Sequence, residues 1–494
     1  MTGADRLVGG VWGHLVGDAV GVPYEFRPGV APGEVGFGAR GSHGQPPGTW
    51  SDDGALMLAL LDSLTAEGVG FDVEDQGRRS VAWKTRGAYT PDGDGRFDIG
   101  GTTRAALRAI ESGVAAAEAG PVGIRDNGNG SLMRILPVAL TGGGLSDGEL
   151  IDRARRASRV THGHPRAQVA CSVYVLVAAR LLAGEQDLAR ALGEAIDAHR
   201  SHDAEESEMV EALDHLLGWT ERSGRGAVWD SFWSSWDAFA GAVSYRSTIE
   251  RAVAYGNDTD TTAAIAGGLA GIYWGIAGIP GGWLAGMRGR AVVGPLVERL
   301  LVGEGWRTSR SDAIRVDWVD LSSVPALRGV ADAGGRLGMT FLPGKHDASD
   351  TRSGPHWRDL RADASRLRGE LGVDALLVLV EDQELEAAGV SDIADAMVGE
   401  GIELLRHPIV DMDVPADHGE LRLTLDDVLG RLRAGSTVVA ACRGGLGRSG
   451  TIVACLLRDG GLDATAAVAL TRESRHGTIE TPAQEAFVAG WAGS

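Results

Sequence analysis

Apolar residues recur at helical spacing from the N-terminus to about residue 305. Their periodicity predicts helices near 7–21, 54–66, 100–118, 146–158, 166–183, 204–219 and 260–277. Glycine and proline residues separate these helical segments from one another. We therefore expect residues 1–305 to form an all-helical domain.

The pattern changes after about residue 326, where apolar runs of strand length alternate with helical segments. Strands are predicted at 376–380, 402–405 and 437–441, and helices at 391–400 and 421–433. Such alternation indicates an α/β domain with a central, mostly parallel sheet, which we place at 326–494. We interpret residues 306–325 as the linker. The expected fold class is therefore a multidomain chain, all-α and then α/β.

The net charge and the cysteine content exclude some partners. The chain of 494 residues carries a net charge of −20, whereas nucleic-acid binding needs clustered lysine and arginine. The three cysteines, Cys171, Cys442 and Cys455, show no spacing typical of a disulfide framework. The N-terminus has no signal-peptide core. We expect a cytoplasmic protein that binds no nucleic acid.

One uncharged stretch, residues 261–287, is long enough to cross a membrane. However, Pro280-Gly281-Gly282 interrupts it, and Asp258 and Asp260 lie directly before it. These features favour a buried core helix followed by a turn. We therefore expect no membrane partner.

The strand predicted at 437–441 leads into a glycine-rich loop with the spacing Cys442-x5-Arg448. Ser449 follows, where a helical pattern begins. Backbone N–H groups of such a loop converge on an anion, and the dipole of the following helix adds to their field. This field favours a cysteine thiolate, and an arginine fork can hold two phosphate oxygens. The loop therefore predicts a phosphate site with a nucleophile at its base.

Two acidic clusters in the helical region each lie at the start of an apolar helix. Each combines carboxylates with a hydroxyl: Ser51, Asp52 and Asp53 in the first, and Asp258, Asp260 and Thr261 in the second. Such residues also serve as helix caps, but capping accounts for only one or two of them per cluster. Oxygen ligands of this type suit a hard divalent cation, and unpaired buried charge is costly. We interpret the clusters as a metal site.

Four blocks in the N-terminal region follow one another in a specific order. They are Gly17-Asp18-Ala19-Val20-Gly21-Val22-Pro23-Tyr24-Glu25, Ser51-Asp52-Asp53, Gly128-Asn129-Gly130-Ser131-Leu132-Met133-Arg134 and Asp258-Thr259-Asp260-Thr261. Together with the smaller landmark Thr161-His162, they resemble the ADP-ribosylglycohydrolase family, whose bacterial type member reactivates dinitrogenase reductase. The resemblance covers roughly residues 5–300, and the combination is highly specific.

This resemblance implies a helical domain with two Mg²⁺ ions, or Mn²⁺, held by the six residues of the acidic clusters. Glu25 would be a mobile carboxylate near the scissile bond, with an exposed loop acid as the alternative. Asp18 is expected to cap its own turn, and His162 either touches the ligand or is an ordinary loop histidine. The residues implied in ADP-ribose binding are Gly100, Gly101, Thr102, Gly128, Asn129, Gly130, Ser131, Leu132, Met133 and His162.

The loop at Cys442 resembles that of the protein tyrosine and dual-specificity phosphatases. With the Leu342-Pro343-Gly344 element, it is similar in particular to the cyclin-dependent-kinase-inhibitor-3-like phosphatases. The resemblance implies Cys442 as nucleophile, Ser449 as the hydroxyl that steadies the thiolate, and no metal. The phosphate-binding residues would be Arg443, Gly444, Gly445, Leu446, Gly447 and Arg448.

Phosphatases of this type also need a general acid, expected about thirty residues upstream within 408–415. We prefer Asp411 over Asp413 for this role, and we expect Gln484 to position water. Ala441 stands where many relatives have histidine. This departure leaves a phosphate-binding pseudoenzyme as an alternative.

Two separate sets of chemical groups on one chain predict a bifunctional hydrolase. The first domain would remove ADP-ribose from a protein side chain or a small acceptor, and the second would hydrolyse a phosphoprotein or a small phosphoester through a phosphocysteine. One alternative is a glycohydrolase that carries a non-catalytic phosphate-binding module. Another is successive processing of one phosphorylated ADP-ribose metabolite.

Overall fold

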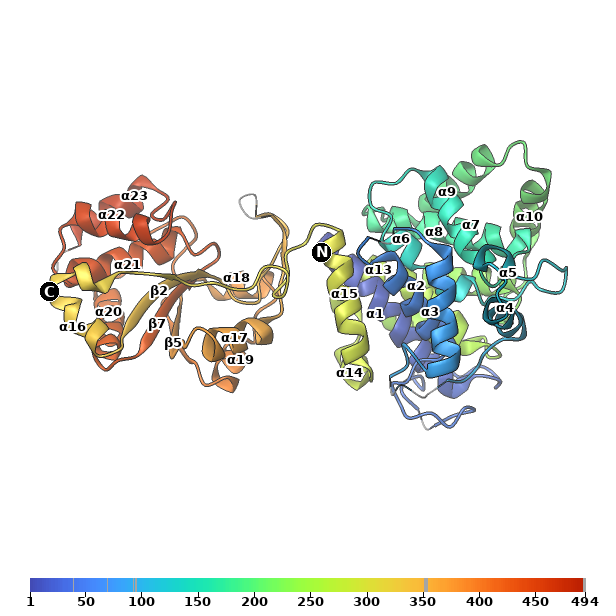
Figure 1. Cartoon of the computed structure of the whole chain (residues 1–494), viewed down its shortest axis with the longest axis horizontal. Coiled ribbons are helices and arrows are strands. Elements are labelled where there is room, and N and C mark those ends of the chain that lie inside the picture. Colours follow the sequence, from blue (N-terminus) through green and yellow to red (C-terminus); the bar gives the residue numbers. More distant parts are fainter. Residues whose placement is uncertain (39, 69, 92, 94–95, 351–353, 492–494) are drawn as a thin grey trace. The chain divides into compact units, whose positions relative to one another are not determined.

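The computed structural model describes residues 1–38, 40–68, 70–91, 93, 96–350 and 354–491. The chain divides into two compact units, Met1–Glu304 and Gly305–Ser494 (Figure 1). The first unit is helical, and the second contains a five-stranded, mostly parallel sheet. The predicted order, all-α followed by α/β, is confirmed.

The first unit is built mainly from twelve helices of ten residues or more among the described residues. They are α1 (Gly3–Gly21), α2 (Asp52–Leu64), α3 (Val73–Arg86), α4 (Gly101–Glu111), α7 (Asp147–Arg159), α8 (Pro165–Leu182), α9 (Leu188–His202), α10 (Ser207–Gly218), α11 (Val228–Ala240), α12 (Tyr245–Ala254), α13 (Thr259–Trp274) and α15 (Arg290–Gly303). Shorter helices are α5 (Ala116–Ala119), α6 (Pro137–Leu140) and α14 (Gly281–Gly286). The periodicity did not predict α3, α9, α11, α12 and α15.

Helices α1 and α13 pack with almost no space between their backbones. Small residues make this possible: an added Cβ at Gly13 would lie 2.4 Å from the carbonyl oxygen of Gly267, and one at Gly17 would lie 2.1 Å from that of Ala263. Gly9 and Gly21 extend the same i, i+4 row along α1. The close approach brings the C-terminal turn of α1 beside the acidic start of α13.

The uncharged stretch 261–287 forms most of the buried helix α13, then a short 3-10 turn at Ile276–Gly278 and helix α14. This matches the predicted core helix and turn. Among the described residues, one helix, α8, has the length and composition to cross a membrane, and 72% of that segment is buried inside its unit.

The sheet of the second unit has the strand order β1-β2-β7-β5-β6. Its strands are β1 (Asp317–Trp318), β2 (Arg336–Phe341), β5 (Ala375–Val378), β6 (Glu403–Arg406) and β7 (Thr437–Cys442). All neighbours are parallel except β1, which runs antiparallel to β2. A separate antiparallel pair joins β3 (His346–Asp347) to β4 (His356–Trp357). Strand β7 is buried throughout, as its central place in the sheet requires.

The expected linker at 306–325 belongs to the folded second unit. Its apolar side chains join the hydrophobic core: Ile314, Val316, Val319, Leu321 and Val324 are each less than 9% exposed. Strand β1 also lies within this stretch and pairs with β2. The stretch looked like a connection because its strand is only two residues long.

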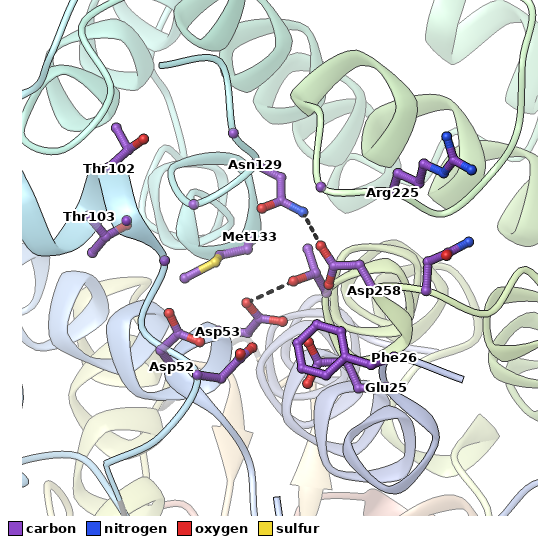
Figure 2. A pocket seen from close by; sticks show the side chains of 18 of the residues that line it. Glu25, Phe26, Asp52, Asp53, Thr102, Thr103, Asn129, Met133, Arg225 and Asp258 are labelled. Atoms are coloured by element: carbon purple, nitrogen blue, oxygen red, sulfur yellow. Dashed lines mark hydrogen bonds between the residues drawn. The ribbon is translucent and has the colours of Figure 1, made fainter. Parts of the chain in front are cut away.

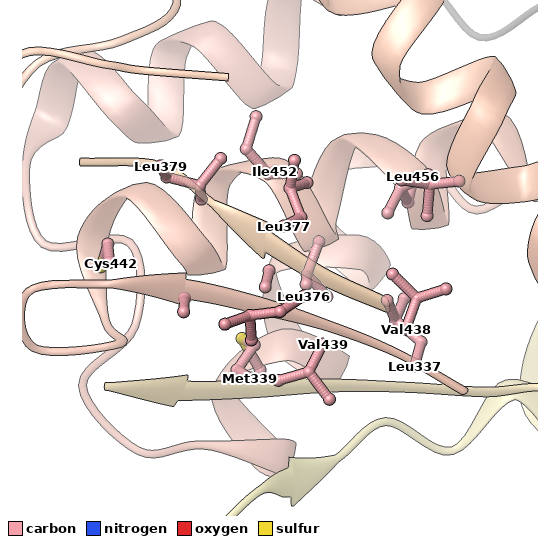
Figure 3. Packing of buried hydrophobic residues seen from close by; sticks show 14 of the residues in the cluster. Leu337, Met339, Leu376, Leu377, Leu379, Val438, Val439, Cys442, Ile452 and Leu456 are labelled. Atoms are coloured by element: carbon pink, nitrogen blue, oxygen red, sulfur yellow. The ribbon is translucent and has the colours of Figure 1, made fainter. Parts of the chain in front are cut away.

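Helices flank the sheet of the second unit. They are α16 (Arg328–Asp332), α17 (Leu360–Gly369), α18 (Asp382–Ala387), α19 (Ile393–Gly399), α20 (His418–Arg433), α21 (Gly447–Asp459), α22 (Ala464–Ser474) and α23 (Pro482–Gly490). Apolar side chains of β2, β5 and β7 pack with Ile452 and Leu456 of α21 (Figure 3). Cys442 lies at the carboxyl end of β7, opposite Phe341 in register. Open parallel sheets bind ligands at this edge.

Candidate active sites

A cavity of about 760 Å³ opens in the helical unit. Its wall combines the start of α2, the start of α13, the loop after α1 and the segments around 100–103 and 128–133 (Figure 2). The volume is that of a pocket for a small molecule of drug or nucleotide size. Carboxylates are concentrated on one side of it.

The first turns of α2 and α13 bring the two acidic clusters together. Thr261 donates a hydrogen bond from Oγ1 to Asp53 Oδ1 at 3.2 Å, although the residues are 208 positions apart. Asn129 donates from Nδ2 to Asp258 Oδ2 at 2.8 Å, which connects the glycine-rich loop to α13. Ser51 is the N-cap of α2, and its Oγ accepts from the N–H of Asp53. The predicted metal residues therefore lie together at two helix N-termini.

Asp18 fixes the position of the first cluster. Its carboxylate accepts hydrogen bonds from the N–H groups of Ser51 and Gly54 at 2.8–3.0 Å. The expectation that Asp18 caps its own turn is wrong, because it caps the start of α2 from α1. Sequence separation hid this contact, which depends on how the helices pack.

The donor set fits a hard divalent cation. One oxygen of Asp53 and one of Asp260 are buried with no hydrogen-bond partner among the described residues. Ligand atoms of Asp18, Asp53 and Asp260 lie within 4.8 Å of one another. Burial and the surrounding carboxylates raise the pKa values of Asp52, Asp53 and Asp260 well above the usual value. A bound cation would offset this repulsion between the carboxylates.

Glu25 lies beside this cluster at the end of the turn Val22–Tyr24. It is 2% exposed, so the alternative of an exposed loop acid is wrong. Its carboxylate contacts His43 Nε2, and oxygens of Glu25, Asp258 and Asp260 lie within 4.8 Å of one another. Burial, with the charges of Asp98 and Asp258, raises the pKa of Glu25 to about 9. A carboxyl group in this environment can carry a proton at neutral pH.

Most of the residues expected to bind ADP-ribose line the cavity: Gly100, Gly101, Thr102, Gly128, Asn129, Gly130, Met133 and His162. His162 is 2% exposed and lies against Gly128 and Gly130, and burial lowers its pKa to about 3. Ser131 and Leu132 are fully buried and are not among the lining residues. Ser131 Oγ instead accepts a hydrogen bond from Ser158 Oγ.

Sequence reasoning missed several residues of this site. Asp98 lines the cavity in a left-handed backbone conformation with φ of 62°. His43 contacts Glu25 and lies 3.9 Å from Asp98. Phe26, Arg27 and Arg225 also line the cavity. The position of Asp98, two residues before Gly100-Gly101-Thr102, was the one available signal.

In the second unit, the loop after β7 has the shape that the sequence predicted. Gly445 has a φ of 70°, and an added Cβ there would lie 2.4 Å from the carbonyl oxygen of Thr340. Among the described residues, no hydrogen bond from the N–H groups of 443–446 to a protein acceptor is found. These amides and the N-terminus of α21 are therefore available to an anion. Cys442 is 3% exposed at the base of the loop.

Arg448 is held at the start of α21 by contacts from other elements. Its guanidinium donates to both carboxylate oxygens of Glu384 at 2.6 and 2.9 Å, and to the carbonyl oxygen of Ile409 at 2.9 Å. It also lies 2.8 Å from Asp411 Oδ1. Although burial opposes it, the hydrogen bonds from Arg448 hold the pKa of Glu384 below its usual value.

The structure distinguishes the two candidate acids in 408–415. Asp411 contacts Arg448 directly, whereas Asp413 Oδ1 accepts from the N–H of Val414. Gln484 is fully buried and donates to the carbonyl oxygen of Asp413 at 3.2 Å, so α23 braces this loop. Ser449 Oγ is buried without a partner among the described residues. The side chain of Arg443 turns to Asp347, with contacts of 2.9 and 3.0 Å.

A helical unit with an acid-walled cavity and an α/β unit with a phosphate loop define a two-domain hydrolase. The chain belongs to the ADP-ribosylglycohydrolase family, whose profile matches residues 1–309. Residues 356–488 match the Swiss Army Knife protein, DSP-PTPase phosphatase domain. The chain is thus an enzyme with a glycohydrolase domain and a phosphatase domain.

Two bacterial hydrolases resemble the first domain. ADP-ribosyl-dinitrogen reductase glycohydrolase of Rhodospirillum rubrum is 30% identical over 303 residues, which cover 58% of this chain and 92% of that protein. ADP-ribosylarginine hydrolase Tri1 of Pseudomonas putida (strain GB-1) is 28% identical over 296 residues, covering 57% and 73%.

Solved structures match each domain in turn. An ADP-ribosylglycohydrolase-related protein complex is 31% identical with a TM-score of 0.50, covering 61% of this chain and 98% of that one. A kinase-associated phosphatase whose catalytic-site cysteine is replaced by serine is 25% identical with a TM-score of 0.32, covering 36% and 93%.

Proposed function

We propose that the chain is a bifunctional hydrolase. Its first domain removes ADP-ribose from arginine side chains with the help of two Mg²⁺ ions, and its second hydrolyses phosphomonoesters through a phosphocysteine. The observation that carries the proposal is that each domain holds a separate set of groups for its own reaction. The similarity of the first domain to an ADP-ribosylarginine hydrolase supports the arginine linkage.

In the first domain, the residues that would hold the metal ions are Ser51, Asp52, Asp53, Asp258, Asp260 and Thr261. Such ions supply a charge that orients sugar hydroxyls and polarises water. Asn129 holds Asp258 in place through its 2.8 Å hydrogen bond. Glu25, buried beside Asp258, gives its proton to the leaving nitrogen and takes one from the attacking water. The glycine loops around Gly100 and Gly128 let the backbone approach the ligand.

In the second domain, the Cys442 sulfur attacks phosphorus while the bond from phosphorus to the leaving oxygen breaks. Asp411 gives its proton to that oxygen, and Arg448 with the loop amides holds the phosphoryl oxygens. Water then attacks the phosphorus of the phosphocysteine, Asp411, now a carboxylate, takes the proton of that water, and the P–S bond breaks. Ser449 Oγ, buried without a partner among the described residues, donates to the departing sulfur, and Gln484 orients the attacking water.

Two substitutions test the two halves separately. Asp258→Ala should abolish release of ADP-ribose from an ADP-ribosylated arginine peptide in the presence of Mg²⁺ while aryl phosphate turnover continues. Cys442→Ser should do the reverse. Unchanged release in the first variant contradicts the glycohydrolase assignment. A wild-type enzyme that binds but never turns over aryl phosphate contradicts the phosphatase assignment and favours a binding module.

A further inference from the structure

The arginines next to the phosphate loop are all engaged by carboxylates. Arg443 is fixed by Asp347, a 6% exposed side chain that also accepts hydrogen bonds from Ser349. Arg448 is fixed by Glu384. Arg475 donates to the carbonyl oxygen of Gly444 at 3.0 Å and pairs with Asp317.

With these ion pairs in place, the loop and its neighbours can bind one phosphoryl group. Arg448 and the loop amides can take the phosphate that reacts. The bidentate contact to Asp347 holds the guanidinium of Arg443 away from a second phosphate. Every arginine described above next to the loop is therefore already paired. A second phosphate of the substrate would find no unpaired arginine among them.

The rim of the same site is acidic and apolar. In the loop after Ile409, Val410 and Met412 are 55% and 53% exposed, and Asp411 and Asp413 are exposed between and after them. On the facing segment, the exposed Glu480 lies over the loop: an added Cβ at Gly447 would be 2.7 Å from its carboxylate oxygen. Gln484 ties the two segments together through the carbonyl oxygen of Asp413.

We infer that the phosphatase domain takes a phosphorylated protein segment with arginine or lysine beside the phosphorylated residue. This inference rests on the proposed phosphatase function and names its substrate class. Cationic side chains complement Asp413 and Glu480, and aliphatic parts of the same peptide cover Val410 and Met412. Polyanions such as inositol polyphosphates or a phosphorylated ADP-ribose meet like charge at this rim and are poor substrates.

The experiment compares two phosphopeptides of one sequence whose flanking residues are arginine in one and glutamate in the other. An inositol polyphosphate and phosphorylated ADP-ribose are measured beside them, and p-nitrophenyl phosphate turnover of the same preparation normalises each rate. We expect kcat/KM to favour the arginine peptide about tenfold. The preference should shrink as NaCl rises from about 50 to about 500 mM, because exposed charges are screened.

Glu480→Lys should reduce the normalised preference to about twofold or less. Glu400→Lys is the matched control: Glu400 is exposed and precedes β6 at the edge of the sheet opposite Cys442, and its variant should keep the wild-type preference. Equal rates for the two peptides, faster turnover of either polyanion, or an unchanged ratio in Glu480→Lys would overturn the inference. If the wild type hydrolyses no phosphoester at all, the proposed phosphatase reaction is overturned, and binding of the two peptides to Cys442→Ser still measures the preference.

Discussion

Arg448 and Glu384 form a two-point ion pair across 64 residues of sequence, with N···O distances of 2.6 and 2.9 Å. The guanidinium is 2% exposed and the carboxylate 18%. Three of the five N–H donors of Arg448 bind Glu384 and Ile409, and Asp411 Oδ1 lies 2.8 Å from Nη2. A phosphate that takes the remaining donors, on Nε and Nη2, competes with Asp411 at Nη2, and this 53% exposed carboxylate can leave. Glu384 therefore positions the arginine, and Asp411 exchanges with the substrate.

Removing the charge of Glu384 should weaken phosphate binding without unfolding the domain. For Glu384→Gln we expect the inhibition constant of vanadate to rise and kcat for p-nitrophenyl phosphate to fall, each about 10- to 100-fold, since one charge-assisted contact of about 1.5–3 kcal/mol is lost. For Glu384→Asp, both the inhibition constant and kcat should lie between the values of the wild type and of Glu384→Gln. Glu386→Gln changes an exposed residue of the same helix and should behave as wild type. If vanadate binds equally well to Glu384→Gln, Glu384 does not position Arg448.

The sequence predicted the parts of both sites that are local in the chain. The strand, loop and helix around Cys442 are contiguous, so their spacing alone specifies the geometry. Glu384, in contrast, reaches Arg448 only because β5 and β7 are neighbours in the sheet. In the first domain, Asp98 and His43 also reach the site only through tertiary packing. They belong to loops with no periodicity, and only the packed helices bring them to Glu25.

The glycine row on α1 should be essential for stability. Gly17→Ala places a Cβ about 2.1 Å from the carbonyl oxygen of Ala263, so α1 and α13 must separate. We expect a loss of about 2–4 kcal/mol in the free energy of unfolding, measured by urea denaturation. Gly193→Ala is the control, because Gly193 lies within α9 with nothing within 4 Å of the added methyl group. It should be neutral or stabilise by up to about 1 kcal/mol. Equal effects of the two substitutions would contradict the close packing.

Divalent cations should stabilise the first domain through the buried carboxylates. With EDTA, the domain's unfolding temperature should fall, and Mg²⁺ at about a hundredfold its Kd should restore about 2.7 kcal/mol. Asp260→Asn should unfold at a higher temperature than wild type in EDTA, since it removes one charge from the cluster, and should gain little from Mg²⁺. Calorimetry with Asp214→Asn, an exposed acid of α10, as control separates this effect from general salt effects. A full Mg²⁺ response in Asp260→Asn would exclude Asp260 as a ligand.

His199 should make the first domain less stable in acid. The side chain is fully buried, with Nδ1 3.0 Å from Asp203 and Nε2 2.9 Å from Ser172 Oγ. Burial lowers its pKa to about 4, even though Asp203 favours the charged form.

The folded state therefore binds a proton on His199 less readily than the unfolded chain, whose histidines titrate near 6.5. The stabilisation is fully present above pH 6.5 and is lost as pH falls towards 4, in total on the order of 3 kcal/mol. His199→Gln should flatten this dependence, while the neighbouring His202→Gln should retain it. Hydrogen exchange of peptides from α8 and α9, measured between pH 7 and 4.5 and corrected for intrinsic exchange rates, reports the local stability around His199. Identical pH profiles for wild type and His199→Gln would show that this histidine is not responsible, and that other buried histidines such as His162, whose pKa burial lowers to about 3, account for the acid sensitivity.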